Sequence, residues 1–125
     1  MTSDRPDPAV VFLSSDLMFG SRLIGAAKAL GVPLQIVANA GDLRAKIPAS
    51  CRLVLVDLSL DKLDLAQTVP VVREVAPAAR IVAFGAHVNE AALAGAAAAG
   101  CDEVLARGQF HKQYAELLKE AAAMP

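Results

Sequence analysis

The stretch Leu53-Val54-Leu55-Val56-Asp57 decides the fold of this chain, because four apolar residues are followed at once by a carboxylate. A short run that is apolar at every position is typical of a strand buried on both faces of a parallel sheet. Similar runs recur along the chain. They are Val10-Val11-Phe12-Leu13, Leu34-Gln35-Ile36-Val37, Ile81-Val82-Ala83-Phe84 and Glu103-Val104-Leu105-Ala106. The sequence therefore predicts five strands, with Asp57 at the end of the third.

Helical patterns separate these strands. Asp16 is expected to cap a first helix that Gly31 closes. Its apolar positions near a 3.6-residue period are Leu17, Leu23, Ile24, Ala27 and Leu30. Further helices are expected at residues 42–47, 64–76, 90–99 and 111–123. Asn89 is expected to cap the helix at residues 90–99. Pro70 predicts either a kink in the third helix or a start at Val69.

The alternation of strands and helices predicts an α/β three-layer sandwich with right-handed crossovers. We expect a flavodoxin-like, five-stranded parallel sheet in the order 2-1-3-4-5, with five helices and its functional edge at the carboxyl ends of the strands. Residues 9–123 would form this single domain. Residues 1–8 and 124–125 are expected to be flexible ends.

The nearly balanced charge of the chain argues against nucleic acid and membrane surfaces as classes of partner. The 125 residues hold 12 Lys and Arg against 13 Asp and Glu, which gives no strong attraction for nucleic acid or an anionic membrane. No apolar stretch approaches the length of a membrane span, and the first residues lack a signal-peptide core. Cys51 and Cys101 are expected to be free thiols in a reducing cytoplasm. A site for a metal built from these cysteines and the two histidines is not expected.

The carboxyl edge of the predicted sheet is where chemistry is expected. The strand ends that meet there read Ser14-Ser15-Asp16, Asp57, Gly85-Ala86-His87 and Arg107-Gly108. A single aspartate that closes a buried strand would lie half desolvated at the centre of this edge. His87 and His111 are expected to be solvated polar residues, since no nucleophile or acid stands at a sequence spacing from either that would indicate a catalytic pair.

Over residues 9–122 the sequence resembles the receiver domain of bacterial two-component response regulators. The resemblance is carried by the order of elements, by Leu-Val-Leu-Val-Asp at residues 53–57, and by Gly-Cys-Asp-Glu-Val-Leu at residues 100–105. It implies that Asp57 stands at the phospho-accepting position of the family.

The other functional positions of the family depart from its pattern. The resemblance implies a pair of Mg²⁺-binding acids where this chain has Ser14 and Ser15, and a Thr or Ser where it has Gly85. It implies a switch aromatic at Val104 and a Lys-Pro pair at Arg107-Gly108. The chain therefore looks like a pseudo-receiver in which only the aspartate is kept.

These departures predict a site without metal or cofactor. Mg²⁺ is usually held by one or two carboxylates with waters and phosphate, and neutral serines cannot supply the missing charge. Asp16 is the one nearby acid that could help, unless it caps the first helix. We expect Arg107 to take both oxygens of Asp57 across the space left at Gly85.

The expected function is a stand-alone receiver-like signalling module that is not an enzyme and acts by docking other proteins. A histidine kinase or a downstream effector would be the partner, and pairing of two copies stays open. One alternative is a single-domain response regulator phosphorylated on Asp57 by a histidine kinase. Another is a small-molecule or nucleotide binder at the carboxyl edge, with an anion cradle formed by residues 14–16 and 20–22.

Overall fold

The computed structural model describes residues 7–123, which form five strands and five α-helices with one short 3₁₀ turn. The strands are β1 (Val10–Leu13), β2 (Leu34–Val37), β3 (Leu53–Asp57), β4 (Arg80–Gly85) and β5 (Glu103–Ala106). The helices are α1 (Leu17–Leu30), α2 (Leu43–Lys46), α3 (Leu65–Val75), α4 (Glu90–Ala98) and α5 (Arg107–Ala123), and the 3₁₀ turn is η1 (Ala40–Asp42). The strands expected from the sequence are thus confirmed.

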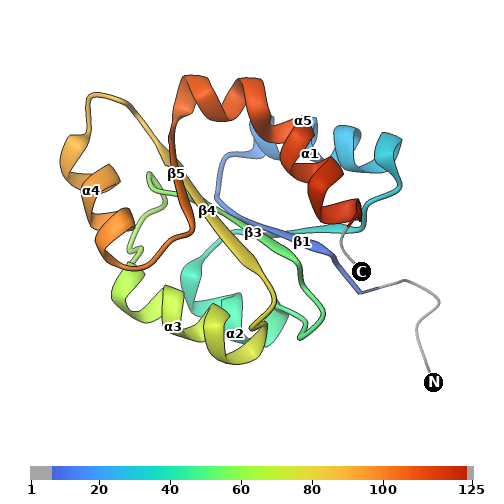
Figure 1. The fold of residues 1–125 in the computed structure, drawn as a ribbon, viewed down its shortest axis with the longest axis horizontal. Coiled ribbons are helices and arrows are strands. Elements are labelled where there is room, and N and C mark those ends of the chain that lie inside the picture. The colour runs from blue at the N-terminus through green and yellow to red at the C-terminus, as the bar shows by residue number, and fades with distance from the viewer. Residues whose placement is uncertain (1–6, 124–125) are drawn as a thin grey trace.

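All strand pairs are parallel, and the sheet order is β2-β1-β3-β4-β5, as predicted for a flavodoxin-like fold. Helices α1 and α5 lie together on one face of the sheet, while α2, α3 and α4 lie on the other side (Figure 1). Asp57 pairs in register with Phe84 at the ends of β3 and β4. The parallel arrangement brings the carboxyl ends of all strands to one edge.

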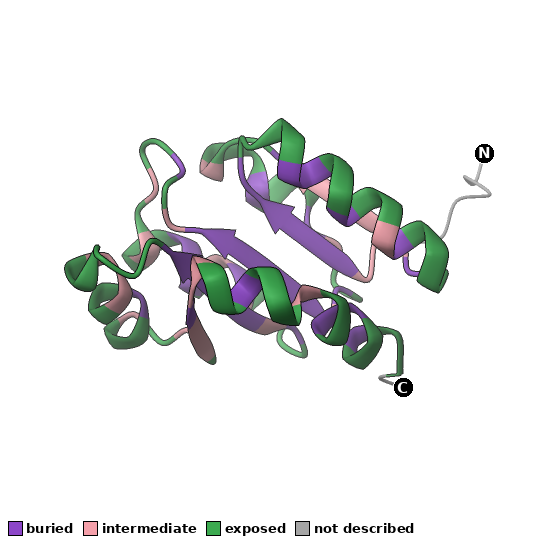
Figure 2. Ribbon diagram, turned by 90° about the horizontal axis from the view of Figure 1, so that it is seen from above, coloured by how far each residue is buried: buried purple, intermediate pink, exposed green. Residues whose placement is uncertain are grey.

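The sheet forms the middle layer of the molecule and is buried on both faces, with the exposed sides of the helices turned outward (Figure 2). β1 and β3 are buried at every position. Alternate residues of each strand face opposite helical layers, so that Val54 and Val56 join one apolar cluster and Leu55 joins the other. This two-sided burial is the physical reason for the uninterrupted apolar runs.

Helix α1 has the predicted caps but buries a different face. Asp16 accepts a hydrogen bond from the N–H of Phe19, and Gly31 ends the helix with a φ of 69°. Phe19, Leu23 and Ala27 are buried because they follow one another at four-residue spacing. Three of the five predicted apolar positions are instead exposed. They are Leu17, Ile24 and Leu30.

Two other helix starts differ from expectation. Helix α3 begins at Leu65, directly after its cap Asp64, so the start at Val69 is wrong and Pro70 lies within the helix. Helix α5 begins at Arg107, four residues before the predicted start. There the side chain of Gln109 accepts a hydrogen bond from the N–H of Ala106, which stabilises the first turn.

The predicted flexible ends fall mostly outside the described residues, since only residues 7 and 8 of the first segment are included, as coil before β1. Among residues 7–123, no helix has the length and apolar character that crossing a bilayer requires.

Candidate functional site

The residues expected at the carboxyl edge come from neighbouring elements. Ser14 follows β1, Asp57 ends β3, Gly85 ends β4, and Arg107 opens α5 directly after β5. Because β1 and β4 flank β3, the ends of these two strands lie on either side of Asp57. The topology thus places Asp57 at the centre of the edge.

The carboxylate of Asp57 is buried and fully engaged by neutral donors. The residue is only 3% exposed. Ser14 Oγ donates to Oδ2 at 2.6 Å, while the N–H and the hydroxyl of Ser59 donate to Oδ1 at 2.9 and 2.6 Å. Both oxygens therefore have partners, as a buried carboxylate requires.

Ser59 was not among the residues singled out from the sequence. Its N–H is two residues beyond Asp57, and an aspartate that accepts a bond from that position forms an Asx-turn. The sequence Asp57-Leu58-Ser59 could have indicated this turn, because it places a serine two residues after an aspartate that ends a strand. The turn supplies the second hydroxyl of the site.

Arg107 reaches Asp57, but not in the predicted two-oxygen geometry. Its Nη2 lies 3.4 Å from Oδ1 of Asp57 and 3.5 Å from the hydroxyl of Ser59. The expectation of a fork on both oxygens is wrong, because one nitrogen of the guanidinium contacts the carboxylate, and it does so at Oδ1. The guanidinium carbon of Arg107 lies 5.5 Å from the centre of the Phe84 ring, within the range of a cation–π contact.

The residues at this edge do not fit a magnesium site. Asp57 is buried there, and its oxygens accept bonds from serine hydroxyls. Asp16 caps α1, which gives it another role. Within residues 7–123 there is no group of three His, Cys, Asp or Glu side chains that could hold a metal ion. Hard divalent cations need more anionic oxygens than one carboxylate offers.

The end of β4 offers Asp57 no side chain, and an apolar neighbour fills the space there. A Cβ added to Gly85 would lie 3.2 Å from Cβ and from Cδ1 of Leu58. Val104 is half-buried and packs, like Leu58, on the apolar cluster that faces α3 and α4. An alanine at position 85 would therefore require Leu58 to shift by a few tenths of an ångström.

The remaining predicted positions lie at the margin of the site or away from it. Ser15 is exposed and lines a separate hollow with Asn39 and Asp61. His87 is exposed in the loop after β4, and Gly108 lies in the first turn of α5 with open space around its Cα.

Both cysteines are free, as expected. Burial raises the pKa of the Cys51 thiol and that of the Cys101 thiol. The negative charge of Asp102 raises the pKa of Cys101 further. Neither thiol therefore has the lowered pKa of a reactive cysteine.

All five aromatic side chains of the chain gather on the α1 and α5 face of the sheet, which the sequence analysis did not foresee. Phe84 stacks on Phe110 with ring centroids 3.9 Å apart. Phe19 packs against Phe110, His111 and Tyr114 at 5.4, 4.6 and 5.3 Å. The cluster joins α1 to α5 directly beneath the end of β4.

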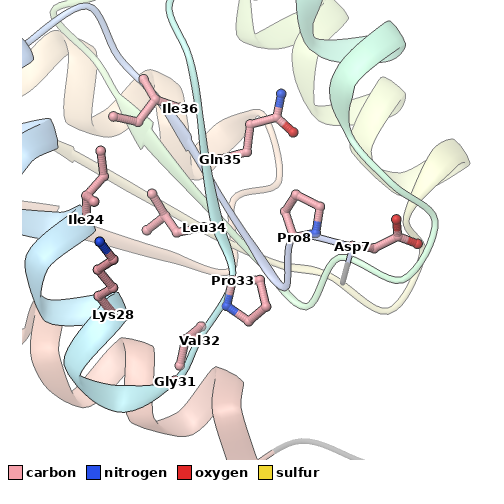
Figure 3. Close-up of a pocket in the computed structure, with 10 residues that line it drawn as sticks. All are labelled: Asp7, Pro8, Ile24, Lys28, Gly31, Val32, Pro33, Leu34, Gln35 and Ile36. Atoms are coloured by element: carbon pink, nitrogen blue, oxygen red, sulfur yellow. The ribbon is translucent and has the colours of Figure 1, made fainter. Parts of the chain in front are cut away.

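A wide groove in the molecule lies away from Asp57. It follows the edge strand β2 toward its amino end, with Ile24 and Lys28 of α1 on one side and Asp7 on the other (Figure 3). None of the residues expected at the carboxyl edge lines it. The groove therefore does not support a ligand at that edge, and the cap of α1 by Asp16 already uses part of the proposed anion cradle.

Comparison with known proteins supports the fold and not a closer relationship. No protein-family model matches the sequence, and no curated protein matches it closely enough to count as a relative. Solved structures do match. A two-component response regulator from Clostridium difficile is 15% identical, with a TM-score of 0.72 over 94% of this chain and 99% of that one.

Two further matches have the same character. The receiver domain of a sensor histidine kinase from Pseudomonas aeruginosa PAO1, which holds a magnesium ion in its active-site cleft, is 16% identical, with a TM-score of 0.71 over 95% of this chain and 100% of that one. A signal receiver domain from Bermanella marisrubri is 19% identical, with a TM-score of 0.69 over 90% and 96%. The chain therefore has the fold of the response-regulator receiver domain, with Asp57 at the end of its third strand.

Proposed function

We propose that this chain is a receiver-like signalling module that acts by docking other proteins and does not depend on Mg²⁺-assisted phosphorylation. The observation that carries the proposal is the set of hydrogen bonds that both oxygens of the buried Asp57 carboxylate accept from Ser14 and Ser59. Hydroxyl and amide donors take the place at both carboxylate oxygens that a cation and a phosphoryl group would need.

Phosphoryl transfer makes specific demands on a site. A divalent cation normally bridges the acceptor and the phosphate oxygens and neutralises the charge that develops. Asp57 stands without a second carboxylate, and it is nearly sealed from solvent. An attack by Asp57 on a phosphodonor would first have to break the bonds from Ser14 and Ser59.

The same arrangement favours one stable conformation. A ligand shifts a conformational equilibrium only when it binds the two states differently. Gly85 offers no hydroxyl to a phosphoryl group, and Val104 has no ring to move. The module would then present its docking surface constitutively, and its partner would be a histidine kinase or a downstream effector.

The second candidate is a phospho-accepting single-domain response regulator. The position of Asp57 supports it, together with the matching histidine-kinase receiver that carries magnesium in its cleft. Arg107 would be the cation left to meet a phosphoryl group. A reducing cytoplasm suits either candidate, and the two free thiols support that setting.

Phosphorylation by a small donor separates the two. The protein and an Asp57→Ala variant are incubated with acetyl phosphate and Mg²⁺, and their intact masses are measured. We expect no phosphate adduct on either protein. A substantial adduct on the parent that is absent from Asp57→Ala would establish the phospho-acceptor instead. A receiver domain with its acidic pair intact, treated in parallel, shows that the donor is active.

A further inference from the structure

One hydrogen-bond route leads from Asp57 to helix α1. The hydroxyl of Ser14 donates to Oδ2 of Asp57 and accepts, at 3.0 Å, a bond from the N–H of Asp16. Asp16 is the cap of α1, and its Oδ1 accepts a bond from the N–H of Phe19 at 3.0 Å. Two side chains thus connect the buried carboxylate to the first turn of α1.

A second route leads from Asp57 to helix α5. Arg107, the first residue of α5, lies 3.4 Å from Oδ1 of Asp57 and also faces the ring of Phe84. That ring stacks on Phe110, one turn further along α5, with an interplanar angle of 4°. The charge of Asp57 therefore helps to position the residue that opens α5.

Both routes end in the same aromatic cluster. Phe19 of α1 contacts Phe110 and His111 of α5, so the two helices meet through these rings. The two helices lie side by side on one face of the sheet (Figure 1). A change at Asp57 that alters the start of either helix would therefore also alter the ring contacts between α1 and α5.

The direction toward α4 is different. Among residues 7–123, the hydrogen-bond donors to the carboxylate of Asp57 belong to Ser14, Ser59 and Arg107, and none belongs to β4, α4 or the loop that joins them. The hydrocarbon side chain of Leu58 fills the space beside Gly85. A hydrocarbon contact carries no hydrogen bond that a change of charge on Asp57 could make or break.

We infer that the state of the Asp57 carboxylate is coupled to helices α1 and α5 and insulated from α4. The inference rests on the proposed function, because it names the surface of the docking module that Asp57 regulates. The α1–α5 face is the surface that a change at Asp57 alters, whether the change is a proton, a substitution or a ligand. Contiguous contacts alone do not establish coupling, which has to be measured.

The test uses the full chain and Asp57→Asn, which keeps the size of the side chain and removes its charge. Amide hydrogen exchange and ¹H–¹⁵N spectra are recorded for parent and variant. Each amide is normalised to those of β1 and β3 that exchange by global unfolding. The loss of one hydrogen bond corresponds to about two- to ten-fold faster exchange. We expect that increase at the hydrogen-bonded amides of residues 19–20 and 110–111, with residues 90–98 unchanged.

Two further variants make the test specific. Ser14→Ala cuts the route to α1, so adding Asp57→Asn to it should affect only residues 110–111. Asp64→Asn removes the carboxylate that caps α3, a matched change whose effect should stay within α3. Changes at residues 90–98 that equal those in α1 and α5 would overturn the inference, and so would changes confined to residues 57–60. Neither outcome depends on whether acetyl phosphate labels Asp57.

Discussion

The hydroxyl of Ser14 lies 2.6 Å from Oδ2 of Asp57 and ties the end of β1 to the end of β3. Ser14 is 1% exposed, so neither group has water as an alternative partner. Ser14 therefore has a structural role, because its hydroxyl is a hydrogen-bond donor to the buried carboxylate. Ser14 and Ser59 together provide hydrogen-bond donors to both oxygens of Asp57.

Replacement of Ser14 should therefore be costly. Ser14→Ala leaves Oδ2 of a buried carboxylate without its donor, and we expect a loss of about 1–3 kcal/mol in the free energy of unfolding. Ser15→Ala is the matched control, because Ser15 is exposed, and it should change stability by less than about 0.5 kcal/mol. Urea denaturation measures both, and equal stabilities for the two variants would refute the structural role of Ser14.

Introducing acids at residues 14 and 15 should convert the site to a cation site. In Ser14→Asp/Ser15→Asp a new carboxylate at position 14 would stand where a hydroxyl now donates to Asp57, and two close carboxylates repel each other. We expect the double variant to be less stable than the parent without metal and to regain stability with Mg²⁺ or Mn²⁺. The melting temperature, measured with and without the cation, should rise for the variant and stay constant for the parent. A rise of equal size in Ser15→Asp alone would place the cation elsewhere.

Gly85 lies in close packing with Leu58, and its backbone conformation does not call for glycine. Its φ is not among the positive values, whereas the added Cβ of Gly85→Ala would lie 3.2 Å from two atoms of Leu58. We expect Gly85→Ala to cost about 1–3 kcal/mol through overpacking. Gly95→Ala in α4 is the control, since no atom lies within 4 Å of its added Cβ, and it should be neutral or stabilising by up to about 1 kcal/mol. Thermal unfolding of the pair tests this, and a tolerated Gly85→Ala would mean that Leu58 moves aside freely.

The sequence predicted the sheet well because burial on both faces leaves a direct mark on composition. The strands of residues 10–13 and 53–57 are apolar at every position for that reason, and Asp57 stands out as the residue that breaks the pattern. The strand order was predicted by taking the flavodoxin-like arrangement for five strand–helix repeats, and the sheet has that order. The caps Asp16 and Asn89 marked two helix starts through a local hydrogen bond.

The details of the site were less predictable because they depend on contacts between distant segments. Ser14 and Asp57 are 43 residues apart, and nothing in either strand shows that a hydroxyl points at the carboxylate. The geometry of Arg107 depended on where α5 begins, which Gln109 sets through the N–H of Ala106. Leu58 beside Gly85 is likewise a packing contact between the residue that follows β3 and the end of β4, which no sequence period encodes.

The pairing of Arg107 with Asp57 should be weak and should not require a guanidinium. The single 3.4 Å contact joins a carboxylate that is 4% exposed to a side chain that is 35% exposed, so solvent screens part of the attraction. A cation at the first residue of α5 also opposes the helix dipole. In a double-mutant cycle of Arg107→Ala and Asp57→Ala we expect a coupling of about 0.5–1 kcal/mol, reduced by 1 M NaCl.

Arg107→Lys decides between this geometry and a two-oxygen fork. A lysine can replace a single nitrogen contact but cannot reproduce a fork, so the Lys variant should keep most of the coupling to Asp57. Gln, which is similar in length and carries no charge, serves as the control and should lose it. Denaturant unfolding of the three variants, each with and without Asp57→Ala, gives the coupling energies. A Lys variant that behaves like Gln would show that Arg107 holds both oxygens, and would mean that the bond from Ser14 to Oδ2 is not the one that secures Asp57.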